Sequence, residues 1–141
     1  GEVVGIPGRL VKVGSRIKAV ADPAFGGSDH LARYVISALK HDQSKRAAIN
    51  VRYDKGIIEL LERKGLSVSF YDRRLEPEDV KRREGATIPW GVGEAIRRIG
   101  RVPDVIYHEG DWGKEPMIVV LGENPVDIAN LIIEISKSIG D

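Results

Sequence analysis

Short apolar runs alternate along this chain with helical patterns, and that alternation limits the folds open to it. Residues 47–53 form a strand-like run, residues 55–64 follow a helical pattern, and residues 66–71 alternate with a period of two. Strands separated by helices of this length predict an α/β fold. We therefore expect one layered α/β/α domain over residues 1–141, with a mixed, largely parallel sheet.

The remaining elements are expected from the same kinds of pattern. The loop between Tyr107 and Met117 is too short for a helical crossover, so the two strands that it joins are predicted to pair antiparallel. The expected strands lie within 3–14, where Gly and Pro interrupt them, and at 17–20, 105–107 and 117–121; the expected helices lie at about 29–40, 76–83, 90–99 and from 124 onward.

The segment between the strand at 17–20 and the helix at 29–40 carries the strongest functional signal. It runs Ala-Asp-Pro-Ala-Phe-Gly-Gly-Ser-Asp-His from Ala21 to His30, and its Ser28 is a good N-cap residue. Such a loop can aim backbone N–H groups, supported by the helix dipole, at an anion such as phosphate. An ordinary strand-to-helix turn with a cap would show the same local pattern.

Composition excludes several classes of protein. The 22 basic and 21 acidic residues give a net charge of +1, which is not the basic footprint of a nucleic-acid binder. The cluster at 81–83 is interspersed with acids and reads as a solvated helix face. The chain has no cysteine, which rules out disulfides, thiol catalysis and cysteine metal sites, and favours a cytoplasmic location.

The bulk properties also bear on location and origin. No apolar run approaches the ~20 residues of a membrane span. The first residue is Gly1 rather than Met, so we expect a domain excised from a longer chain. High charge with no Cys and one Met matches the bias of proteins from heat-loving organisms.

Open α/β sheets bind ligands beyond the C-terminal ends of their strands, and that rule gathers residues that are distant in the sequence. Glycines, cations and an aromatic side chain at those positions suit a phosphorylated, partly aromatic ligand. The residues so gathered are Gly26, Gly27, Ser28 and His30, then Arg52, Tyr53 and Asp54, then Asp72 and Arg73, and finally His108, Asp111, Trp112 and Lys114.

Each candidate has an ordinary alternative. His30 could donate a proton or hydrogen bond to a leaving pyrophosphate, or simply face solvent at a helix start. Arg9 could clamp a phosphate in a bidentate fork, or be an exposed strand arginine, and Arg52 has the same alternative. Trp112, in a polar loop, either packs back on the core or stacks on a planar ligand. Trp90 is expected to be a packing residue at a helix start.

Motifs for other chemistries are missing from the sequence. The spacing of His108, Glu109 and Asp111 matches no established metal-ligand pattern. There is no G-x-x-x-x-G-K-[ST] loop for nucleoside triphosphates and no G-x-S-x-G nucleophile elbow.

Taken in order, several motifs resemble the archaeal-type thiamine-phosphate synthase domain, the ThiN family. The resemblance spans nearly the whole chain. It rests on Asp22-Pro-Ala-Phe-Gly-Gly-Ser-Asp-His-Leu-Ala-Arg33, Ala48-Ile-Asn-Val-Arg-Tyr-Asp54, Pro89-Trp-Gly91, Pro103-Asp-Val-Ile-Tyr107 and Trp112-Gly-Lys-Glu-Pro116.

The resemblance implies a transferase that joins hydroxymethylpyrimidine diphosphate to hydroxyethylthiazole phosphate and releases pyrophosphate. It also implies catalytic roles for an arginine and a histidine, which match Arg9 and His30 by position. Family members are commonly fused to a hydroxymethylpyrimidine phosphate kinase, or follow a helix-turn-helix domain in repressors that sense thiamine phosphate. The sensing domain is therefore the alternative function, and a structural module with a vestigial site is a third.

Partners and ligands follow from the same implied reaction. Mg²⁺ is expected with the diphosphate substrate; its protein ligands are unknown, with Asp22, Asp29 and Asp111 as guesses. We expect small phosphorylated heterocycles as substrates, no membrane or direct nucleic-acid contact, and room for a homodimer. The expected substrate-binding residues are Gly26, Gly27, Ser28, Asp29, Arg52, Asp54, Asp72, Arg73, Trp112 and Lys114.

Overall fold

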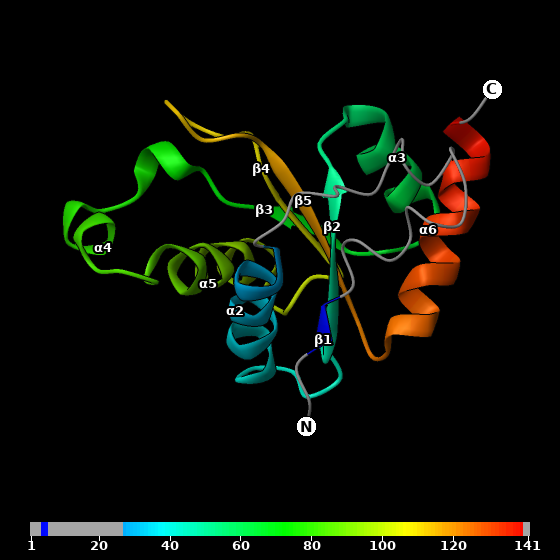
Figure 1. Ribbon diagram of the computed structural model, residues 1–141, viewed down its shortest axis with the longest axis horizontal. Helices are drawn as coiled ribbons and strands as arrows, with labels where there is room; N and C mark the ends of the chain where they lie inside the picture. Colours follow the sequence, from blue (N-terminus) through cyan, green and yellow to red (C-terminus); the bar gives the residue numbers. More distant parts are fainter. Residues whose placement is uncertain (1–3, 6–26, 140–141) are drawn as a thin grey trace.

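A five-stranded sheet forms the middle layer of the molecule (Figure 1). The computed structural model describes residues 4–5 and 27–139. The strands lie in the order β1-β2-β5-β4-β3 across the sheet. Their bounds are Val4–Gly5 for β1, Ala47–Arg52 for β2, Val68–Phe70 for β3, Val105–His108 for β4 and Met117–Gly122 for β5.

Strand β5 runs against the direction of the other four strands. It pairs antiparallel with β2 on one side and with β4 on the other, whereas β1–β2 and β3–β4 are parallel pairs. The predicted antiparallel pairing across the loop after Tyr107 is thereby confirmed. Because the other four strands share one direction, β2, β3 and β4 all end at the same edge of the sheet.

Helices cover both faces of the sheet and make the α/β/α layering that was expected (Figure 1). Helices α2 and α5 lie on one face, and α3 and α6 lie on the other. The short elements η2 and α4 connect β3 to α5. The bounds are Gly27–Leu39 for α2, Lys55–Arg63 for α3, Arg73–Leu75 for η2, Glu78–Arg82 for α4, Thr87–Ile99 for α5 and Pro125–Ile139 for α6.

Alternation along the strands divides the core into two clusters. On β5, Ile118 and Val120 point to the α3/α6 face, whereas Val119 and Leu121 point to the α2/α5 face. The buried side chains of α2, among them Leu31 and Val35, pack on the second face. Burial on both faces explains why the strands read as nearly continuous apolar runs.

The starts of α5 and α2, which lie near the later site, differ from expectation. Helix α5 begins at Thr87 rather than at Trp90, because Pro89 is compatible with the first turn, where its missing N–H has no helical partner in any case. Ser28 lies inside the first turn of α2, which begins at Gly27, so it does not precede the helix as an N-cap would. The strand expected at 17–20 lies outside the described residues.

Asp104 ties together the chain at the opposite edge of the sheet. Its carboxylate accepts hydrogen bonds from Lys45 Nζ at 2.6 Å and from the Ser67 amide at 2.9 Å. Burial raises the pKa of this carboxyl, but the hydrogen bonds from Lys45 and Ser67 outweigh burial and lower it. The network holds the chain ahead of β2, β3 and β4 together.

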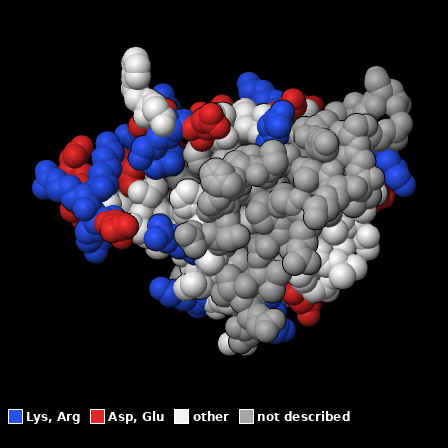
Figure 2. Space-filling model, viewed as in Figure 1, with Lys and Arg blue, Asp and Glu red and all other residues white. Residues whose placement is uncertain are grey.

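Basic and acidic side chains are interspersed on the surface around residues 78–83, as the sequence predicts. Figure 2 shows Lys and Arg beside Asp and Glu at the end of the molecule that carries α4, in which Glu78 and Asp79 precede Lys81 and Arg82. Among the residues that the structure describes, no helix combines the length and apolar character needed to cross a membrane.

Candidate functional site

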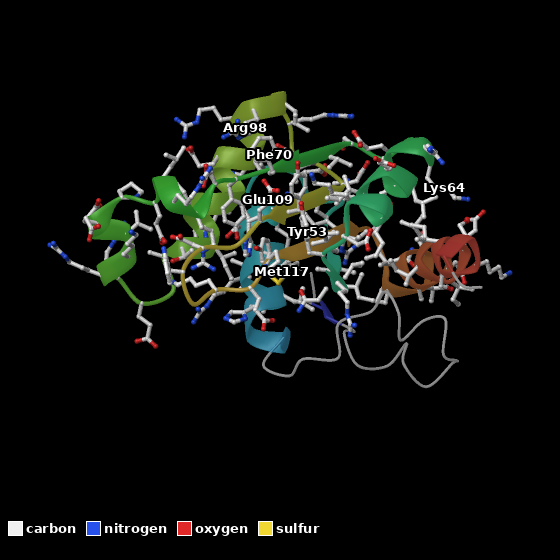
Figure 3. All side chains as sticks on the ribbon, turned by 90° about the horizontal axis from the view of Figure 1, so that it is seen from above. Tyr53, Lys64, Phe70, Arg98, Glu109 and Met117 are labelled. Atoms are coloured by element: carbon white, nitrogen blue, oxygen red, sulfur yellow. The ribbon has the colours of Figure 1, made fainter. Side chains whose placement is uncertain are left out.

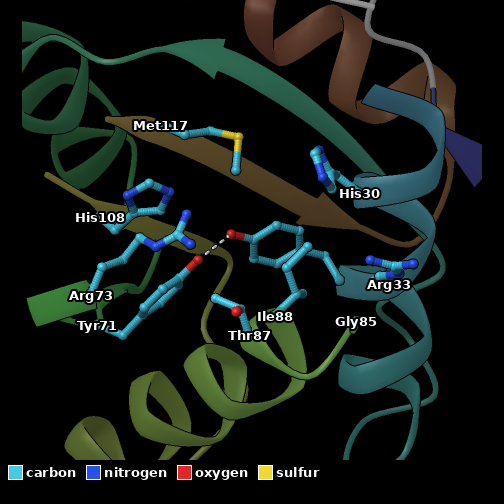
Figure 4. A pocket seen from close by; sticks show the side chains of 10 residues that line it. His30, Arg33, Tyr71, Arg73, Gly85, Thr87, Ile88, His108 and Met117 are labelled. Carbon is cyan, nitrogen blue, oxygen red and sulfur yellow. Dashed lines mark hydrogen bonds between the residues drawn. The ribbon is translucent and has the colours of Figure 1, made fainter. Parts of the chain in front are cut away.

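A cavity of about 180 Å³ opens at the edge of the sheet where β3 and β4 end (Figure 4). It lies on the face covered by α2 and α5. Its walls come from four separate parts of the chain: the start of α2, the segment after β3, the start of α5 and the meeting of β4 with β5. The lining residues are His30, Arg33, Tyr34, Tyr71, Arg73, Gly85, Thr87, Ile88, His108 and Met117.

Strand register sets one wall of the cavity. Met117, the first residue of β5, pairs with Arg52 of β2 on one side and with His108 of β4 on the other. Residues paired directly across antiparallel strands project to the same face of a sheet. Arg52, Met117 and His108 therefore form a row along the ends of three strands, on the cavity side.

Two buried tyrosines form the floor. Tyr34 comes from α2 and Tyr71 follows β3, and their hydroxyl oxygens lie 2.6 Å apart. The Tyr71 ring meets Trp90 edge-on, with ring centroids 5.9 Å apart, so Trp90 is the packing residue that was expected. Burial raises the pKa of both tyrosines, and the neighbouring Tyr71 adds to the effect at Tyr34. Both hydroxyls therefore keep their protons and act as neutral hydrogen-bonding groups.

The turn after β3 separates two adjacent arginines. Asp72 caps η2 and accepts hydrogen bonds from Arg74 Nε at 2.9 Å and from a terminal nitrogen of Arg74 at 2.8 Å. Arg73 instead lines the cavity and is half-buried. Its Nε is buried with no hydrogen-bond acceptor in the described part of the chain. Arg73 therefore offers the cavity a guanidinium group that lacks a full set of protein partners.

His108 is a buried, uncharged group in the same wall. Burial, followed by the positive charges of Arg73 and Lys114, lowers its pKa from 6.5 to about 4. At neutral pH its imidazole therefore adds no positive charge to the cavity.

The start of α5 contributes backbone donors. The N-cap residue of this helix is Ala86, and no side chain in the described part of the protein makes a capping hydrogen bond there. The first N–H groups of a helix have no partner within it, and an uncapped start leaves them available to a ligand. Thr87 anchors this corner, since its hydroxyl donates to the buried carboxylate of Glu76.

The electrostatics of the cavity favour an anion. Arg33 and Arg73 line it together with His30, and no Asp or Glu among the described residues lines it. Helices α2 and α5 both begin at this cavity, and the N-terminal end of each helix dipole is positive. Figure 4 shows His30 and Arg33 on one side of the cavity and Arg73 and His108 on the other.

A cleft of about 410 Å³ adjoins the cavity and shares Tyr71 with it. Phe70 contributes an aromatic wall, stacked on Tyr107 at 5.4 Å and covered on its ring by Arg98 at 4.1 Å (Figure 3). Glu109, whose carboxylate accepts a hydrogen bond from Tyr53, lines the same cleft. Asp72 and Arg74, which also line the cleft, form an ion pair, and the Glu109 carboxylate disfavours a bare anion. With its aromatic side chains, the cleft therefore suits a planar heterocycle better.

The structure brings some of the predicted site residues together. His30 and Arg73 line the cavity from opposite sides, and Arg52 extends the strand-end row beside it. Gly27, Ser28 and Asp29 form the first turn of α2, where His30 also lies. Arg9 and Gly26, and Asp22 among the metal guesses, lie outside the described residues.

Other predicted residues lie elsewhere at this end of the molecule. Asp72 lines the neighbouring cleft, and Asp54 caps α3 by accepting the Gly56 amide. Trp112 is 95% exposed in the turn of the β4–β5 hairpin, which Asp111 and Lys114 close by pairing with each other. Trp112 does not pack back on the core, so that alternative is wrong. Its stacking on a ligand stays a prediction.

Sequence reasoning missed several lining residues, and some had a signal. Arg33 and Tyr34 lie one helical turn after His30 and share its side of α2. Tyr71 directly precedes Asp72, so the strand-end rule could have included it. Gly85, Thr87 and Ile88 had no usable signal, because the start of α5 was placed three residues too late.

The described residues include no group of three or more His, Cys, Asp or Glu side chains that could hold a metal ion. His108 is committed instead to the wall of the cavity.

Comparison with known proteins agrees with the motifs. The sequence pattern of the family described as thiamine-phosphate synthase ThiN matches residues 1–134. A thiamine-phosphate synthase ThiN of Methanothermobacter thermautotrophicus is 48% identical over 136 residues, covering 96% of this chain and 72% of the relative. A bifunctional thiamine biosynthesis protein ThiDN of Methanocaldococcus jannaschii is 39% identical over 138 residues; the match covers 96% of this chain and 31% of that protein.

A solved structure shares both fold and sequence. The crystal structure of the C-terminal domain of a phosphomethylpyrimidine kinase matches with a TM-score of 0.72 and 52% identity. The match covers 79% of this chain and 62% of that one. The layered α/β architecture is therefore shared with a domain that occurs at the C-terminal end of a larger protein.

Proposed function

The chain belongs to the thiamine-phosphate synthase ThiN family, and we propose that it joins hydroxymethylpyrimidine diphosphate to hydroxyethylthiazole phosphate. The products are thiamine phosphate and pyrophosphate. The observation that carries the proposal is the positively charged cavity at the start of α2, lined by His30, Arg33 and Arg73. A diphosphate is the most highly charged group in this reaction, and the cavity supplies cations and helix N-termini for it.

The diphosphate lies across the cavity in this proposal. Arg33 on α2 and Arg73 after β3 hold its oxygens from two sides, and the uncapped amides of α5 contribute further hydrogen bonds. Arg9, outside the described residues, would add a third guanidinium. Donors fixed in place before the reaction stabilise charge as it develops on the leaving group without having to reorganise.

The bond changes follow from the substrates. The C–O bond between the pyrimidine methylene and the diphosphate breaks, and its electron pair leaves with pyrophosphate. The aminopyrimidine ring stabilises the resulting cationic carbon. The lone pair of the thiazole nitrogen then forms the new C–N bond, leaving a thiazolium. His30 donates a hydrogen bond or proton to the departing pyrophosphate, which is the step that most needs an acid.

The neighbouring cleft provides space for a heterocycle. It shares Tyr71 with the cavity, so a ring bound in the cleft lies next to a diphosphate bound in the cavity. Holding the two reactants side by side lowers the barrier by removing the entropy of their encounter. The aromatic wall formed by Phe70 and Tyr71 supports this arrangement.

Mg²⁺ enters this proposal with the diphosphate. No carboxylate among the described residues lines the cavity, so that part of the chain does not offer the oxygen ligands of a resident magnesium site there. The ion supplies charge neutralisation on the diphosphate oxygens when the substrate is bound.

The experiment is an assay of the purified protein with both substrates and Mg²⁺. We expect thiamine phosphate from the wild type, and a loss of turnover on the order of 10² for His30→Ala and for Arg9→Ala. His41→Ala is the matched control, because His41 is exposed beyond the end of α2 and does not line the cavity. It should keep full activity.

Two results would contradict the proposal. A wild-type protein that binds thiamine phosphate in calorimetry but forms none would be a sensing domain. Near-wild-type turnover in His30→Ala would remove that residue from the reaction. The Methanocaldococcus relative is bifunctional and the match covers 31% of it, and the similar solved domain is the C-terminal domain of a phosphomethylpyrimidine kinase. We therefore also propose a fused kinase domain as the partner in the full-length protein.

A further inference from the structure

His108 occupies an unusual place for a histidine. It ends β4, is 2% exposed, and packs its ring against Tyr71 with centroids 5.2 Å apart. One side of the imidazole lines the cavity beside Arg73 (Figure 4). The reaction steps proposed above do not use it.

The loop after β4 fixes which ring nitrogen carries the proton. The Gly110 amide donates a hydrogen bond to His108 Nδ1 at 3.1 Å. A neutral imidazole that accepts at Nδ1 carries its proton on Nε2, so Nε2–H is left as a donor.

Gly110 is required for that arrangement. Its φ is +85°, a conformation that favours glycine, and a Cβ there would lie 2.5 Å from the Lys114 carbonyl oxygen. The hairpin is therefore built so that a backbone N–H reaches His108.

The surroundings also keep the imidazole neutral. Burial disfavours the charged form, and the positive charges of Arg73 and Lys114 act in the same direction. The Gly110 N–H would further oppose a proton on Nδ1. His108 is thus a donor whose charge and tautomer are both set by the fold.

Arg73 supplies a second donor, which no described residue engages. Its Nε is buried and has no acceptor among the described residues. A buried donor left without an acceptor costs free energy, which a ligand that brings an oxygen would recover. The acceptor expected beside a guanidinium is an anionic oxygen, because a charge-assisted hydrogen bond is stronger than one to a neutral ring nitrogen.

We propose that His108 and Arg73 together form a recognition corner for a phosphoryl group, in which the Nε2–H of His108 and the Nε–H of Arg73 each donate to a phosphoryl oxygen. The identity of the substrates rests on the proposed function, whereas the binding chemistry does not. The proposed function places the pyrimidine diphosphate at Arg73; the thiazole monophosphate is the second source of a phosphoryl group, and the kinetics below distinguish the two. A neutral second donor orients that group without adding a charge that would retain the product.

Two substitutions of His108 distinguish its role as a hydrogen-bond donor to the ligand from its role in holding the Gly110 loop. His108→Asn keeps an oxygen near the place of Nδ1, where it can accept the Gly110 amide, but removes the donor at Nε2. His108→Gln places an amide N–H near the position of Nε2. Thermal unfolding of each variant reports whether the fold is retained.

Binding is measured by calorimetry with inorganic pyrophosphate and with inorganic phosphate. We expect His108→Asn to weaken pyrophosphate binding by about tenfold, as the loss of one hydrogen bond to a charged group does, and His108→Gln to stay within about threefold of wild type. Arg73→Gln should also weaken pyrophosphate binding. If His108→Asn fails to fold, the Arg73→Gln measurement tests the proposal instead.

Steady-state kinetics identify the source of the group. A raised KM for the pyrimidine diphosphate in His108→Asn assigns the corner to the diphosphate, and a raised KM for the thiazole phosphate assigns it to the monophosphate. Unchanged binding of both anions in His108→Asn or in Arg73→Gln would overturn the proposal. A larger loss in His108→Gln than in His108→Asn would also overturn it, since His108 would then serve only to hold the loop.

Calorimetry measures binding without turnover. The phosphoryl-binding corner can therefore be tested independently of the proposed synthase activity. A wild type that binds pyrophosphate through this corner but forms no thiamine phosphate contradicts the proposed function and supports the corner.

Discussion

The hydroxyl oxygens of Tyr34 and Tyr71 lie 2.6 Å apart, although the two residues are 37 positions apart in the sequence. One hydroxyl donates to the other at the floor of the cavity. The bond joins α2 to the segment after β3, and these elements supply His30 and Arg73. The spacing of two cationic walls of the site therefore depends in part on this pair.

Removing either hydroxyl should destabilise the fold. We expect Tyr34→Phe and Tyr71→Phe each to lower the free energy of unfolding by about 1 kcal/mol, because the remaining buried hydroxyl loses its partner. Urea unfolding of both single variants and the double variant measures the coupling between them. Tyr53→Phe is the control, since it removes an exposed hydrogen bond to Glu109 and should change stability far less. Additive losses would contradict the pairing.

Gly91 allows the ring of Tyr71 to approach α5. A Cβ built on Gly91 would lie 2.6 to 2.7 Å from three ring carbons of Tyr71. We expect Gly91→Ala to cost about 2 kcal/mol, because the buried ring has no room to move. Gly93→Ala is the matched control in the same helix, with nothing within 4 Å of its Cβ.

The control variant Gly93→Ala should change stability in the opposite direction from Gly91→Ala. Alanine is favoured over glycine inside a helix, so Gly93→Ala is expected to stabilise the protein by up to about 1 kcal/mol. Chemical denaturation of the two variants gives the comparison. Equal stability of Gly91→Ala and wild type would mean that Tyr71 is not held against α5 as described.

His108 should make the fold sensitive to mild acid. Its pKa is lowered from 6.5 to about 4 in the folded chain, so between these values the unfolded chain binds a proton that the folded chain does not. The stability that depends on neutral His108 is complete above the unfolded pKa and is lost as the pH falls toward the folded pKa. From about pH 7.5 to about pH 4.5 the loss is about 2 to 3 kcal/mol.

His108→Gln isolates this contribution, because glutamine does not titrate. We expect wild type to lose about 2 to 3 kcal/mol more than the variant over that pH interval, measured by urea unfolding at each pH. Parallel pH profiles for the two proteins would show that His108 is not buried as a neutral group.

Local sequence patterns predict much of the fold, but they predict only some of the residues that line the cavity. The strand-end rule grouped His30, Arg73 and His108, which do line one cavity, because the rule needs only the order of strands and helices. It could not find the Tyr34–Tyr71 pair, since tertiary packing alone decides that two tyrosines from different elements meet.

The errors at helix starts have a similar cause. The pattern predicts a helix that begins after Pro89, but proline fits the first turn of a helix as well as the position ahead of it. Local sequence did not distinguish the two placements. Because the helix was predicted to begin at Trp90, Gly85, Thr87 and Ile88 were not among the predicted site residues. They line the cavity because α5 begins at Thr87.

Trp112 offers a last test, because its position has no explanation in the packing of the chain. It is 95% exposed in the turn of the β4–β5 hairpin, so Trp112→Ala should leave the thermal unfolding temperature unchanged. If the predicted stacking on a substrate ring holds, the same variant raises the KM of one heterocyclic substrate by about tenfold, in line with the loss of an aromatic stack of about 1 kcal/mol or more. Trp112→Phe, which keeps a flat ring, should restore most of that loss. Unchanged KM values for both substrates in Trp112→Ala would contradict the stacking, because a side chain that contributes nothing to stability and nothing to binding has no place in the site.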